Sequence, residues 1–136
     1  MANKVEAQLV QAYKETTYQV EDPHVEIRID RYHPKLDQLL DKYDSKEWLF
    51  ITAWNPGSQE RASDENKLRN KRLETEFKDK VYFQGSGVPD DNSWTPEESF
   101  LVLGYDKNEA RQLAKKYGQN AVVFGRFKDK AELILL

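Results

Sequence analysis

The stretch WLFITAW, residues 48–54, is the starting point for predicting the fold. Its apolar run from Trp48 to Ile51 is unbroken, which is typical of a strand buried on both faces of a sheet. A strand of that kind lies near the middle of a sheet, so the segments before and after it must supply its neighbours. We therefore predict a central strand here, followed by a turn at Asn-Pro-Gly-Ser, residues 55–58.

Three elements are predicted before the central strand. Residues 3–16 carry apolar side chains at helical spacing and form an amphipathic helix. Residues 25–30 alternate between apolar and charged, which indicates an edge strand or a strand with one wet face. Pro34 suits the first position of a short helix whose apolar stripe ends at Tyr43.

The segments after the turn alternate between helices and strands. In order they are a charged helix over 63–77, a strand over 81–83, a long loop over 84–98, a strand over 100–103, a helix over 106–117, and strands over 121–124 and 133–136. Asp106 and Glu109 have the spacing of a capping box, and Gly118 stands where a helix-ending glycine is expected.

This order of elements indicates a fold class. Strand-helix-strand units are mixed with hairpins, so we predict an α/β or α+β fold with a mixed central sheet of five or six strands and about four helices packed on it. A chain of 136 residues without a linker suits a single domain over residues 1–136.

Composition excludes several kinds of site and partner. There is no cysteine and there are only two histidines, so we expect no metal site and no cofactor. With 21 basic and 24 acidic residues, the chain has no general attraction to nucleic acid or to an anionic membrane, and neither is expected as a partner. No apolar stretch has the length of a signal or of a membrane span, which suggests a cytoplasmic protein.

Polar residues interrupt the apolar pattern at four places, and each has two interpretations. Trp54 and Asn55 follow the central strand, where open sheets often bind ligands, although Asn-Pro is also a common turn. Asn66 and Asn70 share a helix face with Leu73, so the amides either tie down the neighbouring loop or line a polar pocket.

The other two places precede strands. Trp94 is followed by Thr-Pro-Glu-Glu, which is either one capped helical turn or a segment in which Glu98 is a pocket carboxylate and the one candidate general base. Asn120 follows Gly118 in what is either an ordinary turn or another part of the same site.

Longer motifs make the chain similar to a known family. AYxxTxY at 12–18, FITAWNPGS at 50–58, SDENKLRNxxL at 63–73, WTPEESFLVLG at 94–104 and EARQLAKKYGQNAVVFG at 109–125 together resemble the bacterial family catalogued as domain of unknown function 3293. The resemblance implies a bacterial domain and supplies no reaction. Its motifs coincide with the polar interruptions, which favours one shared ligand site made by Trp54, Asn55, Asn66, Asn70, Trp94, Glu98 and Asn120.

Three functions stay open at this point. The first is a module that binds a small polar or planar ligand through amides, tryptophans and a carboxylate, with a regulatory role. The second is a protein-interaction module that docks a partner through the loop at 84–93 or the edge strand at 25–29. The third is a metal-independent hydrolase that uses Glu98 as base; because no activated nucleophile is present in the sequence, we favour a protein that is not an enzyme.

Overall fold

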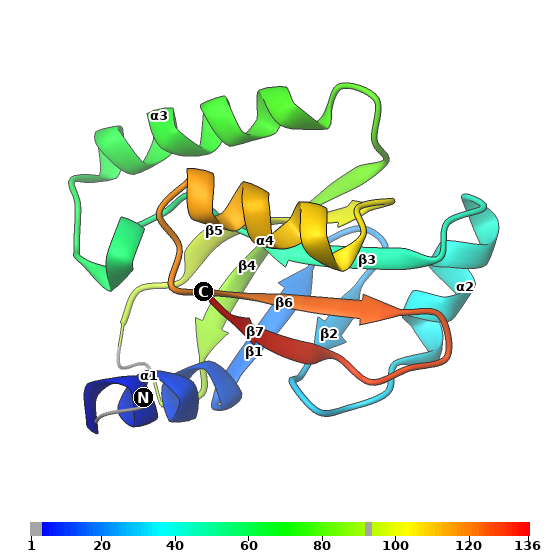
Figure 1. The fold of residues 1–136 in the computed structure, drawn as a ribbon, viewed down its shortest axis with the longest axis horizontal. Helices are drawn as coiled ribbons and strands as arrows, with labels where there is room; N and C mark the ends of the chain where they lie inside the picture. Colours follow the sequence, from blue (N-terminus) through cyan, green and yellow to red (C-terminus); the bar gives the residue numbers. More distant parts are fainter. Residues whose placement is uncertain (1–3, 92–93) are drawn as a thin grey trace.

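A computed structural model describes residues 4–91 and 94–136, which form four α-helices, two short 3₁₀-helices and seven strands (Figure 1). In chain order they are α1 (Lys4–Lys14), β1 (Thr16–Val20), β2 (Val25–Ile27), α2 (Pro34–Lys42), β3 (Glu47–Ile51), η1 (Pro56–Ser58), α3 (Ser63–Glu74), η2 (Thr75–Phe77), β4 (Tyr82–Pro89), β5 (Glu97–Leu103), α4 (Lys107–Lys116), β6 (Ala121–Arg126) and β7 (Glu132–Leu135). No helix in these described ranges is long and apolar enough to cross a membrane.

The seven strands form one curled sheet in the order β2-β1-β4-β5-β3-β6-β7. The mixed α/β class is confirmed, but the prediction of five or six strands in a mixed sheet was wrong. The strand that was not counted is β1, which is largely polar and pairs with β2 on one side and β4 on the other. Every strand pairing among the described residues is antiparallel.

The strand-helix-strand units explain why parallel strands were expected. The α3 segment connects β3 to β4, and these two strands do run in the same direction, but β5 lies between them as an antiparallel neighbour of both. In the same way α4 connects β5 to β6, with β3 between them. The two strands that each crossover connects are therefore separated in the sheet by a third strand, which is antiparallel to both.

The central strand is confirmed. In β3, the four residues from Trp48 to Ile51 are at most 4% exposed, and the strand pairs with β5 on one side and β6 on the other. Alternate side chains of β3 enter two separate cores, with Trp48 and Phe50 on one face of the sheet and Leu49 and Ile51 on the other. One apolar segment thus holds both layers of the molecule together.

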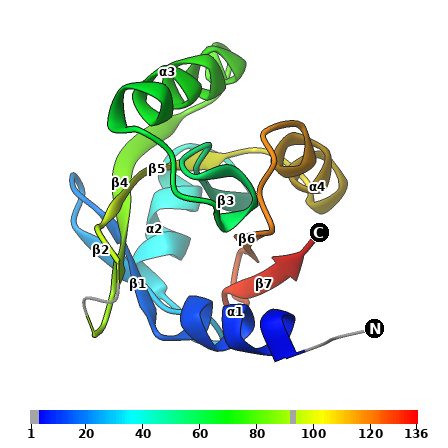
Figure 2. The same cartoon turned by 90° about the vertical axis from the view of Figure 1, so that its left-hand side faces the viewer.

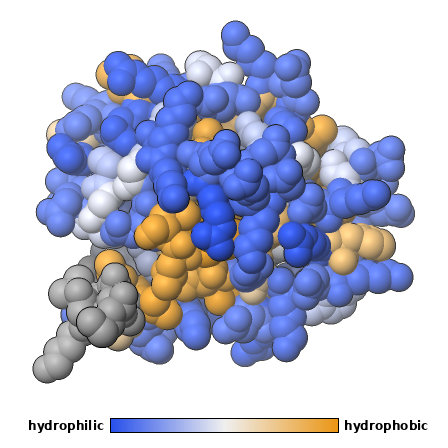
Figure 3. Space-filling model, viewed as in Figure 1, coloured by the Kyte–Doolittle hydropathy of each residue, from blue (hydrophilic) through white to orange (hydrophobic). Residues whose placement is uncertain are grey.

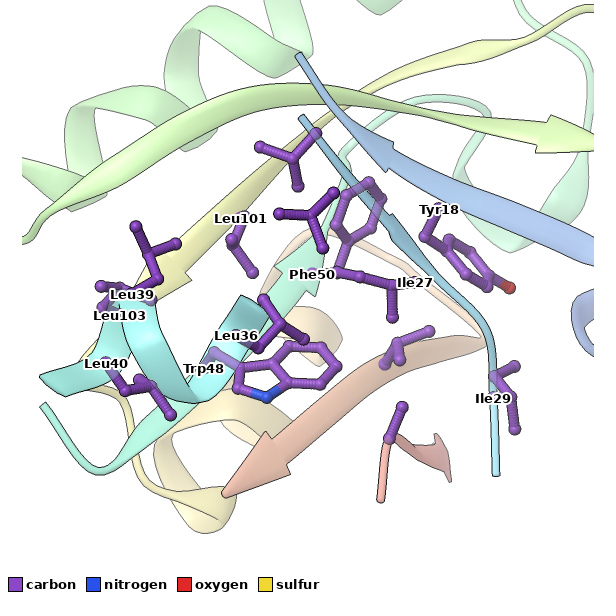
Figure 4. Close-up of a cluster of buried hydrophobic side chains, with 14 residues drawn as sticks. Tyr18, Ile27, Ile29, Leu36, Leu39, Leu40, Trp48, Phe50, Leu101 and Leu103 are labelled. Atoms are coloured by element: carbon purple, nitrogen blue, oxygen red, sulfur yellow. The ribbon is translucent and has the colours of Figure 1, made fainter. Parts of the chain in front are cut away.

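The helices divide between the two faces of the sheet, which curls into a half-barrel (Figure 2). On the concave face, Leu36, Leu39 and Leu40 of α2 pack with Trp48 in the cluster drawn in Figure 4. On the convex face, α3 and α4 cover a second cluster that includes Leu73 and Phe124. The α1 helix lies at the other end of the concave face from α2 (Figure 2).

The segment between residues 84 and 98 differs most from its prediction. The predicted loop is mostly strand, because β4 continues to Pro89 and β5 begins at Glu97; residues 92 and 93 lie outside the described residues. Position 85 of β4 requires glycine, because a Cβ atom there would lie 2.2 Å from the carbonyl oxygen of Gln19 in the adjacent strand. The predicted helical turn at residues 95–98 was also wrong, since Glu97 already pairs with Gly87.

The helix predictions agree with the structure. Asp106 accepts a hydrogen bond from the amide of Glu109 at 2.8 Å, and the Glu109 carboxylate accepts one from the amide of Asp106 at 3.0 Å, which is the predicted capping box. Gly118 ends this region with φ of +70°, a left-handed conformation that glycine adopts without strain.

Candidate functional site

A cleft of about 750 Å³ opens on the concave face, between α1 and the end of the sheet farther from α2. Its walls come from α1, from the loop after β3 and from the turn before β6. Its floor consists of the side-chain positions that β1, β4 and β5 present to it: Thr16, Tyr18, Gly87, Glu97 and Ser99. Close by, Figure 3 shows apolar side chains gathered over β7 and the C-terminus, where Leu135 is 51% exposed and Leu136 is 36% exposed.

The wall that follows β3 is held in shape by a reciprocal pair of amides. Asn55 has φ of +47°, a left-handed conformation that asparagine tolerates better than most residues. Its backbone amide donates to Oδ1 of Asn66 at 2.8 Å, and Nδ2 of Asn66 donates back to Oδ1 of Asn55 at 2.8 Å. The backbone amide of Arg61 also donates to Asn55 Oδ1, at 2.9 Å. The loop is therefore fixed by hydrogen bonds to a buried side chain of α3.

Asn70 fixes the two strand ends next to that wall. Its Oδ1 accepts from the backbone amide of Ala53 at 2.8 Å, and its Nδ2 donates to the carbonyl oxygen of Glu98 at 2.8 Å. The side chains of Asn66 and Asn70 are both buried and both paired, so tying down the loop is one of their roles. Asn66 also lines the cleft, whereas Asn70 does not.

Glu97 supplies the carboxylate of the cleft. Within β5 its side chain lies on the same face of the sheet as Ser99 and Leu101, because alternate strand residues face the same way. Nδ2 of Asn55 donates to Glu97 Oε2 at 3.1 Å, and this is the one hydrogen bond of the Glu97 carboxylate to residues in the described ranges. Burial raises the pKa of Glu97 above its ordinary value, and the hydrogen bond from Asn55 partly opposes that shift.

Glu98, which we expected to be the pocket carboxylate, does not line the cleft. It is exposed and points away from the concave face, because it occupies the alternate position in β5. Its contribution is its carbonyl oxygen, which accepts hydrogen bonds from Thr52 at 2.6 Å and from Asn70 at 2.8 Å. The predicted strand began only at residue 100, so the alternation within β5 that would have selected Glu97 was not applied to residues 97–99.

The turn before β6 meets the loop after β3. The backbone amide of Gly57 donates to the carbonyl oxygen of Gly118 at 2.7 Å, and Nδ2 of Asn120 donates to the Ser58 hydroxyl at 2.9 Å. That hydroxyl lies 3.4 Å from the hydroxyl of Tyr13, so α1 is connected to the same turn. Asn120 supports the wall through Ser58 and does not itself line the cleft.

Arg69 of α3 forms hydrogen bonds with both of these segments. Its Nε donates to the carbonyl oxygen of Ala53 at 2.9 Å, and its Nη2 donates to that of Tyr117 at 2.8 Å. The guanidinium therefore connects the end of β3 to the end of α4. No local pattern in the charged helix predicted at 63–77 marks Arg69 as the arginine that points inward.

The predicted site residues separate into two groups. Trp54, Asn55, Asn66 and Trp94 line the cleft, whereas Asn70, Glu98 and Asn120 lie behind or beside its walls. Lining residues that the sequence reasoning did not select include Tyr13, Thr16, Ser58, Glu97, Ser99 and Gln119. Strand alternation would have found Glu97 and Ser99, whereas Tyr13 and Ser58 are brought together only by the tertiary fold.

Two tyrosines at the α1 side of the cleft have altered acidity. Burial raises the pKa of Tyr13, with a further contribution from the negative charge of Glu97. Burial raises the pKa of Tyr18 strongly, and the Tyr18 hydroxyl donates to the carbonyl oxygen of Tyr13 at 2.9 Å. Both phenols therefore stay protonated at neutral pH. In the described part of the chain no group of three or more His, Cys, Asp or Glu side chains is arranged to hold a metal ion.

A comparison with protein-family models gives one match. The model described as "Protein of unknown function (DUF3293)" matches residues 51–122, more than half of the chain. The chain belongs to the DUF3293 family. No curated protein and no solved structure gives a significant match. The DUF3293 match contains Asn55, Asn66 and Glu97, whereas Tyr13 and Thr16 on the α1 side lie outside it.

Proposed function

We propose that the chain binds a small polar or planar molecule in the cleft between α1 and the sheet, and that binding, not catalysis, is its function. The proposal rests on one observation: Glu97, a carboxylate whose pKa is raised by burial, lies in a cleft of about 750 Å³ whose walls are already held in place. A cavity of that size suits a small-molecule ligand, and a buried ionisable group in a cleft is a recognised marker of a binding site.

The hydrogen bonds that hold the cleft walls in place support ligand binding without rearrangement. Asn55 orients Glu97, Asn66 orients Asn55, and Asn66 itself is 1% exposed on a helix packed against the sheet. A site of this kind has little conformational entropy to lose when a ligand arrives. Trp54 and Trp94 add flat apolar surfaces at the cleft, which suit a ring in the ligand.

The hydrolase alternative is less well supported. Glu98, the candidate base, faces away from the cleft, and the side chains of Asn55 and Asn66 already donate to Glu97 and to Asn55. The interaction alternative relied partly on a free loop at residues 84–93, but residues 85–89 pair with β1 and residues 85–87 also pair with β5, in the interior of the sheet. Its other surface, β2, is an edge strand of three residues.

The experiment compares the wild-type protein with Gly87→Val, which fills the floor of the cleft. A Cβ atom at Gly87 would meet no heavy atom closer than 3.8 Å, so the variant is expected to fold. Ser86→Val is the matched control, since it adds the same side chain one residue away on the opposite face of β4. Both variants are first checked by circular dichroism.

All three proteins are then screened against a panel of small polar and aromatic metabolites of positive, negative and zero charge, with amide chemical shifts as the readout. The proposal expects at least one compound to shift the resonances of Gly87 or Ser99 in the wild type and in Ser86→Val, and to leave Gly87→Val unchanged. A panel without such a compound, or compounds that bind Gly87→Val equally well, would contradict it.

A further inference from the structure

We infer that the ligand of this cleft is an organic cation, which places an ammonium, amidinium or guanidinium group over Gly87 and donates hydrogen bonds to Glu97. This inference rests on the proposed function and adds the chemical class of the ligand. Four observations carry it: the direction in which the hydroxyls of the floor donate, the position of Glu97, the space at Gly87, and the aromatic residues around the cleft.

The hydroxyls of the floor all donate their protons to backbone carbonyls. Thr16 Oγ1 donates to Ala12 at 2.7 Å, Tyr18 donates to Tyr13 at 2.9 Å, and Ser99 Oγ donates to Glu97 at 2.9 Å. A carbonyl oxygen can only accept, so the direction of each bond is determined by its partner. What these three hydroxyls can still offer a ligand is an oxygen lone pair.

With Glu97 included, every polar side chain of the floor can offer a ligand only a hydrogen-bond acceptor. An ionised carboxylate only accepts hydrogen bonds, and Oε1 of Glu97 accepts none from residues 4–91 or 94–136, since the Asn55 bond goes to Oε2. None of the five floor residues has a side-chain N–H. A ligand with N–H donors and positive charge satisfies this surface, whereas an anion meets only lone pairs and negative charge.

Gly87 leaves room for the cationic group. It pairs directly with Glu97 on one side and Tyr18 on the other, so the three positions share one face of the sheet. Unlike Gly85, Gly87 has no neighbour that forbids a side chain, since a Cβ atom there would lie 3.8 Å from the closest atoms of Thr16 and Tyr18. A glycine inside a strand destabilises it by about 0.5–1 kcal/mol relative to alanine. A glycine with room for a side chain is therefore kept beside the carboxylate at the expense of stability, as at sites where a ligand approaches the backbone.

The rest of the lining also suits a cation. Five aromatic residues line the cleft, namely Tyr13, Tyr18, Phe50, Trp54 and Trp94, and aromatic faces attract positive charge. The charged residues of the lining are Glu60, Arg61 and Glu97, two acidic and one basic. Arg61 is exposed at the rim and lies 3.7 Å from Glu65, so its charge is partly countered outside the cleft.

Three indoles of nearly equal size test this inference. Tryptamine is cationic, tryptophol is its neutral alcohol, and indole-3-acetate is an anion. Each is titrated into the wild type at millimolar concentration with amide chemical shifts as the readout. The inference expects tryptamine to shift Gly87 and Ser99 and to bind at least about tenfold more tightly than either of the other two, a difference of about 1.4 kcal/mol.

Two carboxylate variants assign the preference to Glu97. In Glu97→Gln, the amide oxygen can still accept from Asn55 while the charge is lost, so tryptamine should bind no better than tryptophol. Glu98→Gln removes a carboxylate from the opposite, exposed face of the same strand, outside the cleft, and should keep the preference.

Equal or tighter binding of tryptophol or indole-3-acetate would overturn the choice of a cation and would leave the proposed binding function supported, because the cleft would still bind an indole. A tryptamine preference that survives in Glu97→Gln would overturn the role of Glu97. Failure of tryptamine to shift any cleft resonance would also contradict the inference, and the metabolite panel then decides the proposed function independently.

Discussion

The two ends of the concave sheet face use the same kind of strand pair in opposite ways. At the closed end, beneath α2, Trp48 of β3 stands opposite Gly125 of β6, and its indole covers the glycine. At the open end, beside α1, Glu97 of β5 stands opposite Gly87 of β4, where a Cβ atom would lie at an ordinary contact distance of 3.8 Å from Thr16 and Tyr18. The first glycine is required by packing and the second by nothing in the fold, which is why we connect the second to a ligand.

The largest expected effect is at the closed end. A Cβ atom at Gly125 would lie 2.3 Å from Cε2 of Trp48, so Gly125→Ala should force the indole out of a core in which it is 2% exposed. We expect a loss of about 3 kcal/mol in the free energy of unfolding, the upper part of the usual range for overpacking. Urea unfolding measures this, with Gly87→Ala as the control that should not be destabilised. Equal stability of Gly125→Ala and the wild type would show that the closed end is not closed by packing.

The second prediction concerns the open end, where the Asn70 amide bonds to the segment after β3 and to the start of β5. Asn70→Ala removes the acceptor for the Ala53 amide and the donor to the Glu98 carbonyl, both at the boundary between β3, β5 and the cleft wall. Leaving buried backbone groups without a partner costs about 1–3 kcal/mol, so we expect a loss of about 2 kcal/mol. Lys71→Ala, on the exposed face of the same helix, is the control. A loss no greater than that of Lys71→Ala would mean that water replaces the amide.

The third prediction is a gain. Gly87→Val should raise the free energy of unfolding by about 1 kcal/mol, because valine loses less backbone entropy than glycine and suits a strand. The same substitution at Gly85 should instead lower the free energy of unfolding, since its Cβ would lie 2.2 Å from the Gln19 carbonyl oxygen. Chemical unfolding of both variants gives the comparison. Destabilisation of Gly87→Val by as much as Gly85→Val would indicate that the open end is a packed region like the closed one.

The smallest expected effect depends on pH. Because burial raises the pKa of Glu97 in the folded state, the folded protein holds the proton more tightly than the unfolded chain does. The contribution of this group to stability is complete below its ordinary pKa of 4.5 and is lost as the pH rises through the raised value.

Glu97→Gln, which cannot ionise, should therefore match the wild type in free energy of unfolding near pH 4 and exceed it at pH 7. Thermal unfolding across this pH range provides the measurement, and Glu60→Gln at the exposed rim is the control. A difference between wild type and Glu97→Gln that does not change with pH would show that Glu97 is not held in a desolvated position.

The sequence predicted those parts of the fold that depend on near neighbours. The α4 capping box between Asp106 and Glu109 spans three residues, and the apolar run of β3 is continuous, so both could be read directly. The second part of β4, residues 84–89, was missed because Gly85 and Gly87 have low strand propensity, and Gly85 is required by a carbonyl in another strand. Whether a glycine marks a turn or a close approach is decided by residues far away in the sequence.

The candidate site was predicted to a similar extent. The polar face of α3 was evident from the spacing of Asn66 and Asn70, and both are buried. The carboxylate was misassigned by one residue, because the two faces of a strand differ by one position and the predicted strand began only at residue 100. Tyr13 contributes to the cleft only through the packing of α1, 45 residues away from its partner Ser58, and no local pattern could have indicated that.

The order of strands also determines when this chain can fold during synthesis. The apolar strand β3 has both of its partners later in the sequence, β5 ending at Leu103 and β6 ending at Arg126, and β4 cannot join β3 until β5 lies between them. A growing chain that has emerged as far as residue 90 holds β1, β2 and β4 as a small sheet, while β3 has no neighbour to pair with. Sheets built from such distant pairings form slowly and expose apolar segments in the meantime. A nascent chain should therefore stay sensitive to protease in β3 until β6 has been made.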